Sequence, residues 1–348
     1  MYQSYEELIQ KEKYLKLNAA GQLVIDYPEK LKILDFHTHM SNLLPGKQKD
    51  PTQKGTYLKY QTLPPVQFID LRRPYWTDIN YNKKYNGFFS VIKYSMDGIK
   101  IFNDMVNGGT FDNCFLSQED NMIQKSVILP ISSLKSDQSC AALDIANKYP
   151  EKFIPFCSVH PLDPKMKEKI HQYKKMGAKG FKLKITEMEM KNKTEAIINL
   201  LKTCYDVQLP VLFHTGAMVE TQGQKKSGIM AKLLKSTRTK LYGELLKNLP
   251  KDFVFIFGHS GIQEYRLVAQ YMKKFPSCYA EVSAQSEESI RYLMDEVGSE
   301  RILFGSDWPA LPQAMTLSRV LLATEDSPIS RENILYKNAE RILENNYV

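Results

Sequence analysis

The sequence predicts a single (β/α)8 barrel, an α/β fold in which eight parallel strands alternate with helices. First, short apolar runs rich in β-branched and aromatic residues alternate with longer helical stretches from about residue 122 onward. Second, together with one earlier run these strand candidates number eight, each followed by enough chain for a helix. Third, four of the six histidines and one aspartate stand at or just past the ends of these runs, where barrel enzymes carry their chemistry. A doubly wound sheet is the rival architecture, and the third observation favours the barrel.

The strands follow one another at regular intervals after the first. We expect the first strand at residues 32–37, after an N-terminal extension of residues 1–30. The other seven are expected at residues 126–131, 153–159, 180–185, 210–214, 253–259, 278–283 and 301–307. Because α/β barrels routinely exceed the usual domain length, we assign residues 1–348 to one domain.

Residues 41–124 separate the first two strands by far more chain than a normal βα connection and contain no strand series of their own. We interpret this stretch as an insertion. Its middle, residues 72–81, is aromatic and basic, and residues 94–105 are expected to be helical. Because the insertion follows a barrel strand, it leaves from the active-site face. A lid over the pocket, a dimer arm and a helical excursion packed on the barrel rim are all consistent with it.

Composition indicates a globular protein with a sizeable core, since 43% of the residues are hydrophobic and 25% are charged. The net charge of +8 is spread over helical stretches as solvated lysines, so a nucleic-acid partner is not expected. No apolar run approaches the roughly 20 residues of a membrane span, and no signal peptide is evident. The five cysteines are scattered and form no Cys-x-x-Cys pair, which disfavours a disulfide framework and a thiolate zinc site. We therefore expect a cytoplasmic protein, and a homo-oligomer is compatible with the sequence.

His37 and His39 end the first strand. Residues two apart on a strand project to the same face, so both imidazoles could reach one metal ion. Asp35 would share that face lower in the barrel or orient the two histidines as an outer partner. Taken alone, the pair is a weak signal, and an ordinary surface or core position explains it better than a metal site.

Three further strands end in the same way. His214 closes the apolar run before Gly216, His259 follows the next run, and Asp307 follows the last one. A core histidine bonded to backbone, or an aspartate that caps a helix, would explain any one of them. The recurrence of the arrangement on strands one, five, six and eight favours a functional site.

These motifs resemble the amidohydrolase superfamily, and within it the amidohydrolase-related branch of hydrolases, lactonases and non-oxidative decarboxylases. The resemblance covers residues 31 to about 345, and its sharpest matches are His37-Thr38-His39, His214-Thr215-Gly216, Gly258-His259-Ser260-Gly261 and Gly305-Ser306-Asp307-Trp308-Pro309. It implies that His37, His39, His214 and Asp307 hold one divalent metal, with His259 beside it but not an obligatory ligand. Zinc is the first expectation, with manganese, iron or cobalt as alternatives.

Strand four departs from the pattern of these relatives. They often show Lys-Leu-His-Pro there, whereas this chain has Lys182-Leu183-Lys184-Ile185. Lys184 could bind a substrate carboxylate or, if carboxylated, bridge a second metal; a solvent-facing or salt-bridged lysine is the alternative. Trp308 could wall the pocket, Glu281 could face the barrel interior and pair with either lysine, and a structural role is expected for His160.

The function expected from these residues is that of a metal-dependent hydrolase. Its substrate is expected to be small, and an acidic substrate is compatible with the site. A divalent ion lowers the pKa of a bound water to about 7 and so supplies hydroxide. Asp307 would be the general base, and His259 would polarise the carbonyl of an amide, lactone or ester. A metal-dependent decarboxylase of a small carboxylic acid is the alternative. A barrel that only binds or scaffolds is a third hypothesis, which the retention of all five site residues disfavours.

Overall fold

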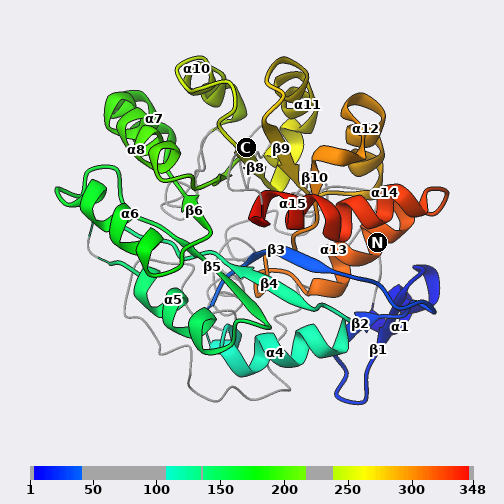
Figure 1. Ribbon diagram of the computed structural model, residues 1–348. Helices are drawn as coiled ribbons and strands as arrows, with labels where there is room; N and C mark the ends of the chain where they lie inside the picture. Colours follow the sequence, from blue (N-terminus) through cyan, green and yellow to red (C-terminus); the bar gives the residue numbers. More distant parts are fainter. Residues whose placement is uncertain (1–3, 41–106, 135, 217–237, 345–348) are drawn as a thin grey trace, which may run out of the picture.

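A computed structural model describes residues 4–40, 107–134, 136–216 and 238–344 of the chain. Eight parallel strands form one sheet in which every strand pairs with its neighbours in sequence, so the spatial order from β3 to β10 is the order along the chain. The strands are β3 (Leu34–Thr38), β4 (Lys125–Ile128), β5 (Phe153–Cys157), β6 (Gly180–Leu183), β7 (Val211–His214), β8 (Phe255–Gly258), β9 (Cys278–Glu281) and β10 (Ile302–Leu303). Each overlaps one predicted run, and the predicted (β/α)8 barrel is confirmed (Figure 1).

The barrel closes where the first and last strands meet. No continuous ladder joins β3 to β10, but backbone bonds just beyond them do: the N–H of Asp307 donates to the carbonyl of His37 (2.8 Å), and the N–H of His39 donates to the carbonyl of Trp308 (2.7 Å). We call this junction the seam. At the seam, the carboxyl end of the first barrel strand lies beside the segment that follows the last one.

Helices surround the sheet (Figure 1). They are α4 (Phe111–Asp120), α5 (Ser139–Lys148), α6 (Met166–Lys175), α7 (Glu187–Asn192), α8 (Thr194–Asp206), α10 (Tyr242–Leu246), α11 (Tyr265–Lys274), α12 (Glu287–Val297), α13 (Gln313–Ala323), α14 (Pro328–Glu332) and α15 (Asn338–Glu344). Short helical segments precede or follow several of these helices. One of them, six residues long, covers His259–Glu264.

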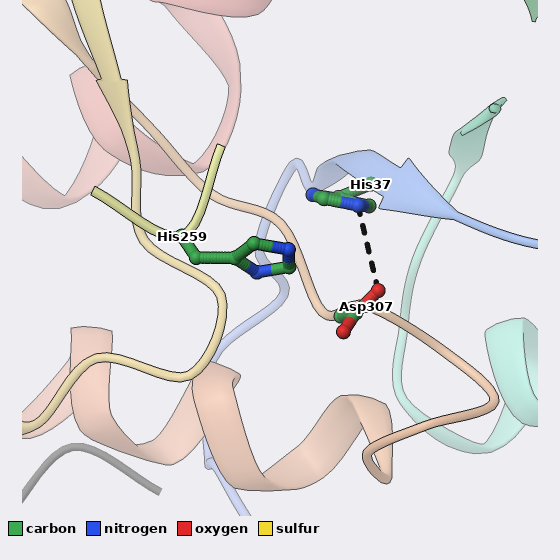
Figure 2. Close-up of side chains that lie close together, drawn as sticks. All are labelled: His37, His259 and Asp307. Atoms are coloured by element: carbon green, nitrogen blue, oxygen red, sulfur yellow. Dashed lines mark ion pairs between the residues drawn. The ribbon is translucent and has the colours of Figure 1, made fainter. Parts of the chain in front are cut away.

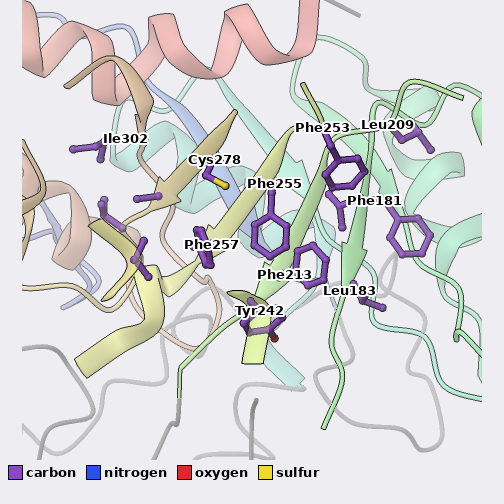
Figure 3. Close-up of a cluster of buried hydrophobic side chains, with 14 of the residues drawn as sticks. Phe181, Leu183, Leu209, Phe213, Tyr242, Phe253, Phe255, Phe257, Cys278 and Ile302 are labelled. Atoms are coloured by element: carbon purple, nitrogen blue, oxygen red, sulfur yellow. The ribbon is translucent and has the colours of Figure 1, made fainter. Parts of the chain in front are cut away.

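Alternation along the strands divides the core into an outer and an inner layer. Phe181, Phe213 and Phe255 point outward into the large cluster between sheet and helices (Figure 3). The rings of Phe213 and Phe255 stack with their centroids 4.1 Å apart. Burial of these side chains against the helices fixes which face of each strand points to the barrel axis.

The inner layer fills the lower part of the barrel. Phe36 and Phe156 meet edge to face with centroids 5.5 Å apart and pack with Leu212 and Ile256, and Ile342 of α15 belongs to the same buried cluster. This plug leaves the polar residues at the carboxyl ends of the strands as the upper layer.

The N-terminal extension packs on the outside of the barrel. It consists of α1 (Tyr5–Lys11) and an antiparallel hairpin of β1 (Leu15–Leu17) and β2 (Leu23–Ile25). Leu8, Leu15 and Leu23 form a separate buried cluster with Leu311 and Met315, at and within α13. The extension therefore covers the helix that follows the last strand.

The predicted insertion ends earlier than expected. Residues 111–120 form α4, which leads into β4 as the helix of an ordinary βα unit, so residues 107–124 belong to the barrel itself. Residues 41–106, including the aromatic and basic stretch 72–81 and the expected helix 94–105, lie outside the described residues.

Two observations bear on the expected environment of the protein. All five cysteines are free thiols. Among the described residues, no helix combines the length and the apolarity that a bilayer crossing requires.

Candidate functional site

An irregularity in β3 directs His37 into the barrel. The register of β3 against β4 shifts between Asp35 and Thr38. Phe36 already faces the inner core, and in a regular strand its neighbour His37 would face outward. The shift, which has the character of a β-bulge, lets both side chains point inward.

Asp35 does not share this face, so the first of the two alternatives expected for it is wrong. Its fully buried carboxylate accepts hydrogen bonds from the N–H (2.9 Å) and Oγ (2.6 Å) of Ser306, from Nε2 of Gln313 (2.9 Å) and from the N–H of His37 (3.1 Å). Burial raises its pKa to about 7. Asp35 orients the backbone of His37 and the backbone of the seam at Ser306. It bonds no imidazole, because the register shift places its side chain on a different face from that of His37.

Three acceptor atoms meet at the carboxyl ends of β3 and β10. Nε2 of His37 lies 3.2 Å from Nε2 of His39 and 3.4 Å from Oδ1 of Asp307. Nε2 of His39 lies 3.3 Å from the same carboxylate oxygen. The three atoms form a nearly equilateral triangle across the seam.

The outer nitrogens of both rings fix where the protons are. Nδ1 of His37 lies 2.6 Å from Oε2 of Glu281, and Nδ1 of His39 lies 2.7 Å from the carbonyl oxygen of Leu129. Both partners only accept, so each Nδ1 carries the hydrogen and each Nε2 presents a lone pair. Burial lowers the pKa of both imidazoles, which keeps them neutral. The triangle thus holds three lone-pair donors, and a donor that reaches it is Nζ of Lys182, 3.1 Å from Nε2 of His37.

His259 and His214 stand on the other side of the site. Nε2 of His259 lies 3.0 Å from Nδ1 of His214, and Nδ1 of His259 lies 2.7 Å from Oγ of Ser283. Nε2 of His214 is buried and has no hydrogen-bond partner within the described part of the chain. Burial lowers the pKa of His259 to about 3.

His37, His259 and Asp307 offer ligand atoms that all lie within 4.8 Å of one another. Figure 2 shows these three side chains facing one another, His37 from β3, His259 from the turn after β8 and Asp307 from the loop after β10. Burial alone would raise the pKa of Asp307, whereas its neighbours lower it to well below its usual range, and its attraction to Lys182 and Lys184 favours the ionised form. The carboxylate is therefore ionised at neutral pH.

The backbone is strained where it presents these groups. His259, Ser260 and Asp307 adopt left-handed conformations with φ of 59°, 45° and 61°. Non-glycine residues rarely occupy this region, and such strain clusters at functional sites. The turn after β8 and the turn after β10 hold these residues in place despite that cost.

Lys182 of β6 faces the barrel interior, one of the alternatives left open for it, and Lys184 lies just beyond the end of the strand. Lys182 is completely buried, and its Nζ lies 3.1 Å from Nε2 of His37. Burial lowers the pKa of Lys182 to about 7. Lys184 is partly exposed. Neither lysine forms an ion pair with another described residue, so the expected pairing with Glu281 is wrong: that carboxylate bonds His37 instead.

Trp308 is also placed differently from the expectation. Its indole is fully buried and packs with Cys114, Ile128 and Ala142, on the side of the seam that faces α4 and α5. It offers no open surface to a substrate there, and its position does not support the predicted substrate contact.

Sequence reasoning missed the contacts of His37 with Glu281 and Lys182, and it missed Ser283 as the partner of His259. The only available signal was the two-residue alternation along each strand. It places Gly180, Lys182 and Lys184 on a common face of the β6 segment. In the same way it places Tyr279 and Glu281 on a common face of β9. That alternation identifies the inward residues but not which of them come into contact.

Comparison with known families settles the class of the chain. A protein-family model described as amidohydrolase matches residues 116–344. The chain belongs to the amidohydrolase family. No functionally curated protein matches the sequence of this amidohydrolase.

Solved structures share its fold at low sequence identity. An uncharacterised TIM-barrel protein of Bordetella bronchiseptica is 15% identical with a TM-score of 0.58, and the match covers 91% of this chain and 99% of that one. A 5-carboxyvanillate decarboxylase of Novosphingobium aromaticivorans, crystallised with manganese, is 13% identical with a TM-score of 0.52, covering 90% and 96%. A probable 2-pyrone-4,6-dicarboxylic acid hydrolase of Acinetobacter baumannii is 13% identical with a TM-score of 0.52, covering 68% and 89%. The barrel thus occurs in decarboxylases and in a hydrolase alike.

Proposed function

We propose that this amidohydrolase is a metal-dependent hydrolase that holds one divalent cation between His37, His39, His214 and Asp307. The triangle of lone pairs is the observation that supports this most directly. Three buried acceptors that face one another at 3.2–3.4 Å repel, and a cation between them removes that cost. Ligand atoms bound to one tetrahedral zinc at about 2.0–2.2 Å lie about 3.3–3.6 Å apart, which is close to these separations. The unpartnered Nε2 of His214 supplies a fourth lone pair.

Zinc is the first candidate for the ion, because two or three imidazoles with one carboxylate suit it; manganese, iron and cobalt accept the same donors. One ion is proposed. A second ion bridged by a carboxylated Lys184 would show as a metal content of two per chain.

When bound, such an ion supplies hydroxide at neutral pH by lowering the pKa of a bound water to about 7. Asp307 is ionised, and its Oδ1 faces Nε2 of His37 and of His39. We assign to its other carboxylate oxygen the role of taking a proton from water and returning it to the leaving group. The carbonyl-polarising role expected for His259 requires a hydrogen on Nε2, whereas here that atom is within bonding distance of Nδ1 of His214. We therefore assign His259 first to holding His214, and its role in catalysis stays a prediction.

The lysines of β6 support an acidic substrate. Lys182, in β6, and Lys184, just beyond its end, face the site and are not matched by a salt-bridge partner among the described residues. A carboxylate beside Lys184 would supply that partner at the open end of the strand. We therefore propose that Lys184 binds an acidic group of the substrate.

The same lysines favour a second candidate, a metal-dependent decarboxylase. A substrate carboxylate held by lysine could be the group that is released as well as the group that is recognised. Hydrolysis and decarboxylation are therefore tested together.

The experiment has two stages. Metal content is measured for the purified protein and for His39→Ala; about one ion per chain in the first and a marked loss in the second are expected, and no bound metal in the wild type would refute the proposal. The metal-loaded protein is then incubated in ¹⁸O-water with a panel of lactones and aromatic acids. Incorporation of ¹⁸O into the product supports the hydrolase, whereas carbon dioxide release without incorporation supports the decarboxylase. Metal binding with neither outcome on the panel would count against both and favour a binding protein.

A further inference from the structure

A buried carboxylate that the proposed reaction does not use lies behind the site. Glu281, the last residue of β9, is completely buried, and its Oε2 accepts from Nδ1 of His37 (2.6 Å), the N–H of His259 (3.0 Å) and Oγ of Ser283 (2.9 Å). Its Oε1 accepts from the N–H of Ser283 (2.5 Å). Four donors thus converge on one side chain, and two of them are backbone groups that can only donate.

These contacts give the hydrogen-bond chain a direction. Ser283 has one hydroxyl hydrogen, and it donates that hydrogen to Glu281. Its oxygen must then accept from His259 at 2.7 Å, so Nδ1 of His259 carries a hydrogen and Nε2 carries a lone pair. A neutral imidazole has one hydrogen on its ring nitrogens. In His259 the position of that hydrogen is set by the Glu281 carboxylate through two successive hydrogen bonds, with Ser283 between them.

The direction continues to the proposed fourth ligand. Because Nε2 of His259 accepts, Nδ1 of His214 must donate across their 3.0 Å contact. Nε2 of His214 is then left as a lone pair, and this is the buried atom without a partner. The hydroxyl of Tyr242 donates to the backbone carbonyl of His214 (2.8 Å) and fixes the residue from the other side.

We propose that Glu281 is the positioning residue of the site, which sets the tautomer of His37 directly and those of His259 and His214 through Ser283. One carboxylate on β9 thereby leaves a lone pair on Nε2 of His37, in β3, and another on Nε2 of His214, in β7. The assignment of tautomers stands on the hydrogen bonds alone, whereas its benefit for metal binding rests on the proposed function. The two parts can be tested apart.

The first test needs no metal. The chain has six histidines, so nitrogen-15 NMR of the imidazole rings in the metal-free protein can resolve each tautomer. We expect hydrogen on Nδ1 for His37, His259 and His214. In Ser283→Ala the assignments of His259 and His214 should change or become mixed while that of His37 is kept. Hydrogen on Nε2 of His259 and His214 in the wild type, or an unchanged pattern in Ser283→Ala, would overturn the proposal.

Asp35→Asn is the matched control. Asp35 is likewise fully buried and accepts four hydrogen bonds, but none from a histidine ring. Glu281→Gln should disturb the tautomers of all three histidines, and Asp35→Asn should leave them in place. Equal disturbance by both substitutions would show that loss of any buried carboxylate loosens the site, and the positioning role would be refuted.

The second test measures affinity for zinc by competition with a chelator. Loss of an outer partner of a metal-binding histidine typically weakens binding about 10–100-fold, and we expect a loss in that range for Glu281→Gln, a smaller one for Ser283→Ala and the smallest for Asp35→Asn. Affinity unchanged in Glu281→Gln would overturn the positioning role. Absence of zinc binding in the wild type would instead refute the proposed function, while the NMR result would still decide the tautomers.

Discussion

Gly180 is the position where a single added methyl group should test the inner packing of the barrel. A Cβ on Gly180 would lie 2.2, 2.4 and 2.6 Å from three ring atoms of Phe156. The ring cannot retreat easily, because it is fully buried and meets Phe36 edge to face. Gly180→Ala must therefore displace an aromatic ring at the centre of the barrel.

The expected cost follows from three contributions. Overpacking a filled core costs about 1–3 kcal/mol. Disturbing the pair of Phe36 and Phe156 costs about 0.5–1.5 kcal/mol more, and alanine regains about 0.5–1 kcal/mol over glycine in a strand through the unfolded chain. We expect Gly180→Ala to lower the free energy of unfolding by about 2 kcal/mol.

The assay is a double-mutant cycle in urea, with unfolding followed by circular dichroism. Phe156→Leu removes the ring atoms that the new methyl group meets, so Gly180→Ala should be neutral or stabilising by up to about 1 kcal/mol in that background. Gly243→Ala is the control: its Cβ would lie 2.5 Å from the hydroxyl end of Tyr271, which can swing away, and alanine suits α10. If Gly180→Ala lowers the free energy of unfolding by the same amount in the wild type and in the Phe156→Leu background, the reasoning is refuted.

Three further predictions concern other parts of the molecule. Gly305→Ala would place Cβ 2.2 Å from Oε1 of Glu281, so we expect a loss of about 2 kcal/mol in unfolding free energy together with weaker zinc binding; zinc affinity equal to that of the wild type would contradict this. His160 donates to Glu189 (3.1 Å) and this bond holds the pKa of the carboxyl at about 2, below its ordinary 4.5. The contribution of this bond is about 1 kcal/mol, because the carboxyl is partly exposed, and it should be complete above about pH 4.5 and disappear as the pH falls toward about 2. The urea midpoints of the wild type and of Glu189→Gln should therefore converge as the pH falls from about 5 toward 2, and a constant gap would count against it. Leu8→Ala should cost about 2–3 kcal/mol if the N-terminal extension unfolds with the barrel, and a cost near zero in urea would show that it unfolds separately.

The strands could be predicted from the sequence because both faces of a parallel barrel strand are buried. Such strands are continuous apolar runs that end in glycine, proline or a polar residue, as residues 210–214 and 253–259 do. The convergence of His37, His39 and Asp307 follows from the same fact, since the carboxyl ends of parallel strands share one edge. Local composition therefore determined most of the architecture.

Contacts inside the site could not be predicted in this way. The face of Asp35 was wrong because a register shift of one residue reverses the side of every residue before it, and no local pattern marks that shift. The roles of Lys182 and Lys184 depend on how deep each lies beside β3, which is set by the stagger of the whole barrel. Glu281 met a histidine 244 positions away, a pairing that only the closed barrel creates.

The seam has a consequence for how the barrel holds together. In sequence, 269 positions separate Ser306 from His37, yet their strands are joined there by a few backbone bonds only. A cation held jointly by His37, His39 and Asp307 would act as a reversible cross-link that closes a loop spanning the whole barrel. Cross-links that close long loops restrict the unfolded ensemble most, and metal binding energy becomes folding energy where the site exists only in the folded state. Amide hydrogen exchange at the seam should then slow on loading with metal far more than exchange at β5 and β6, which carry no proposed ligand.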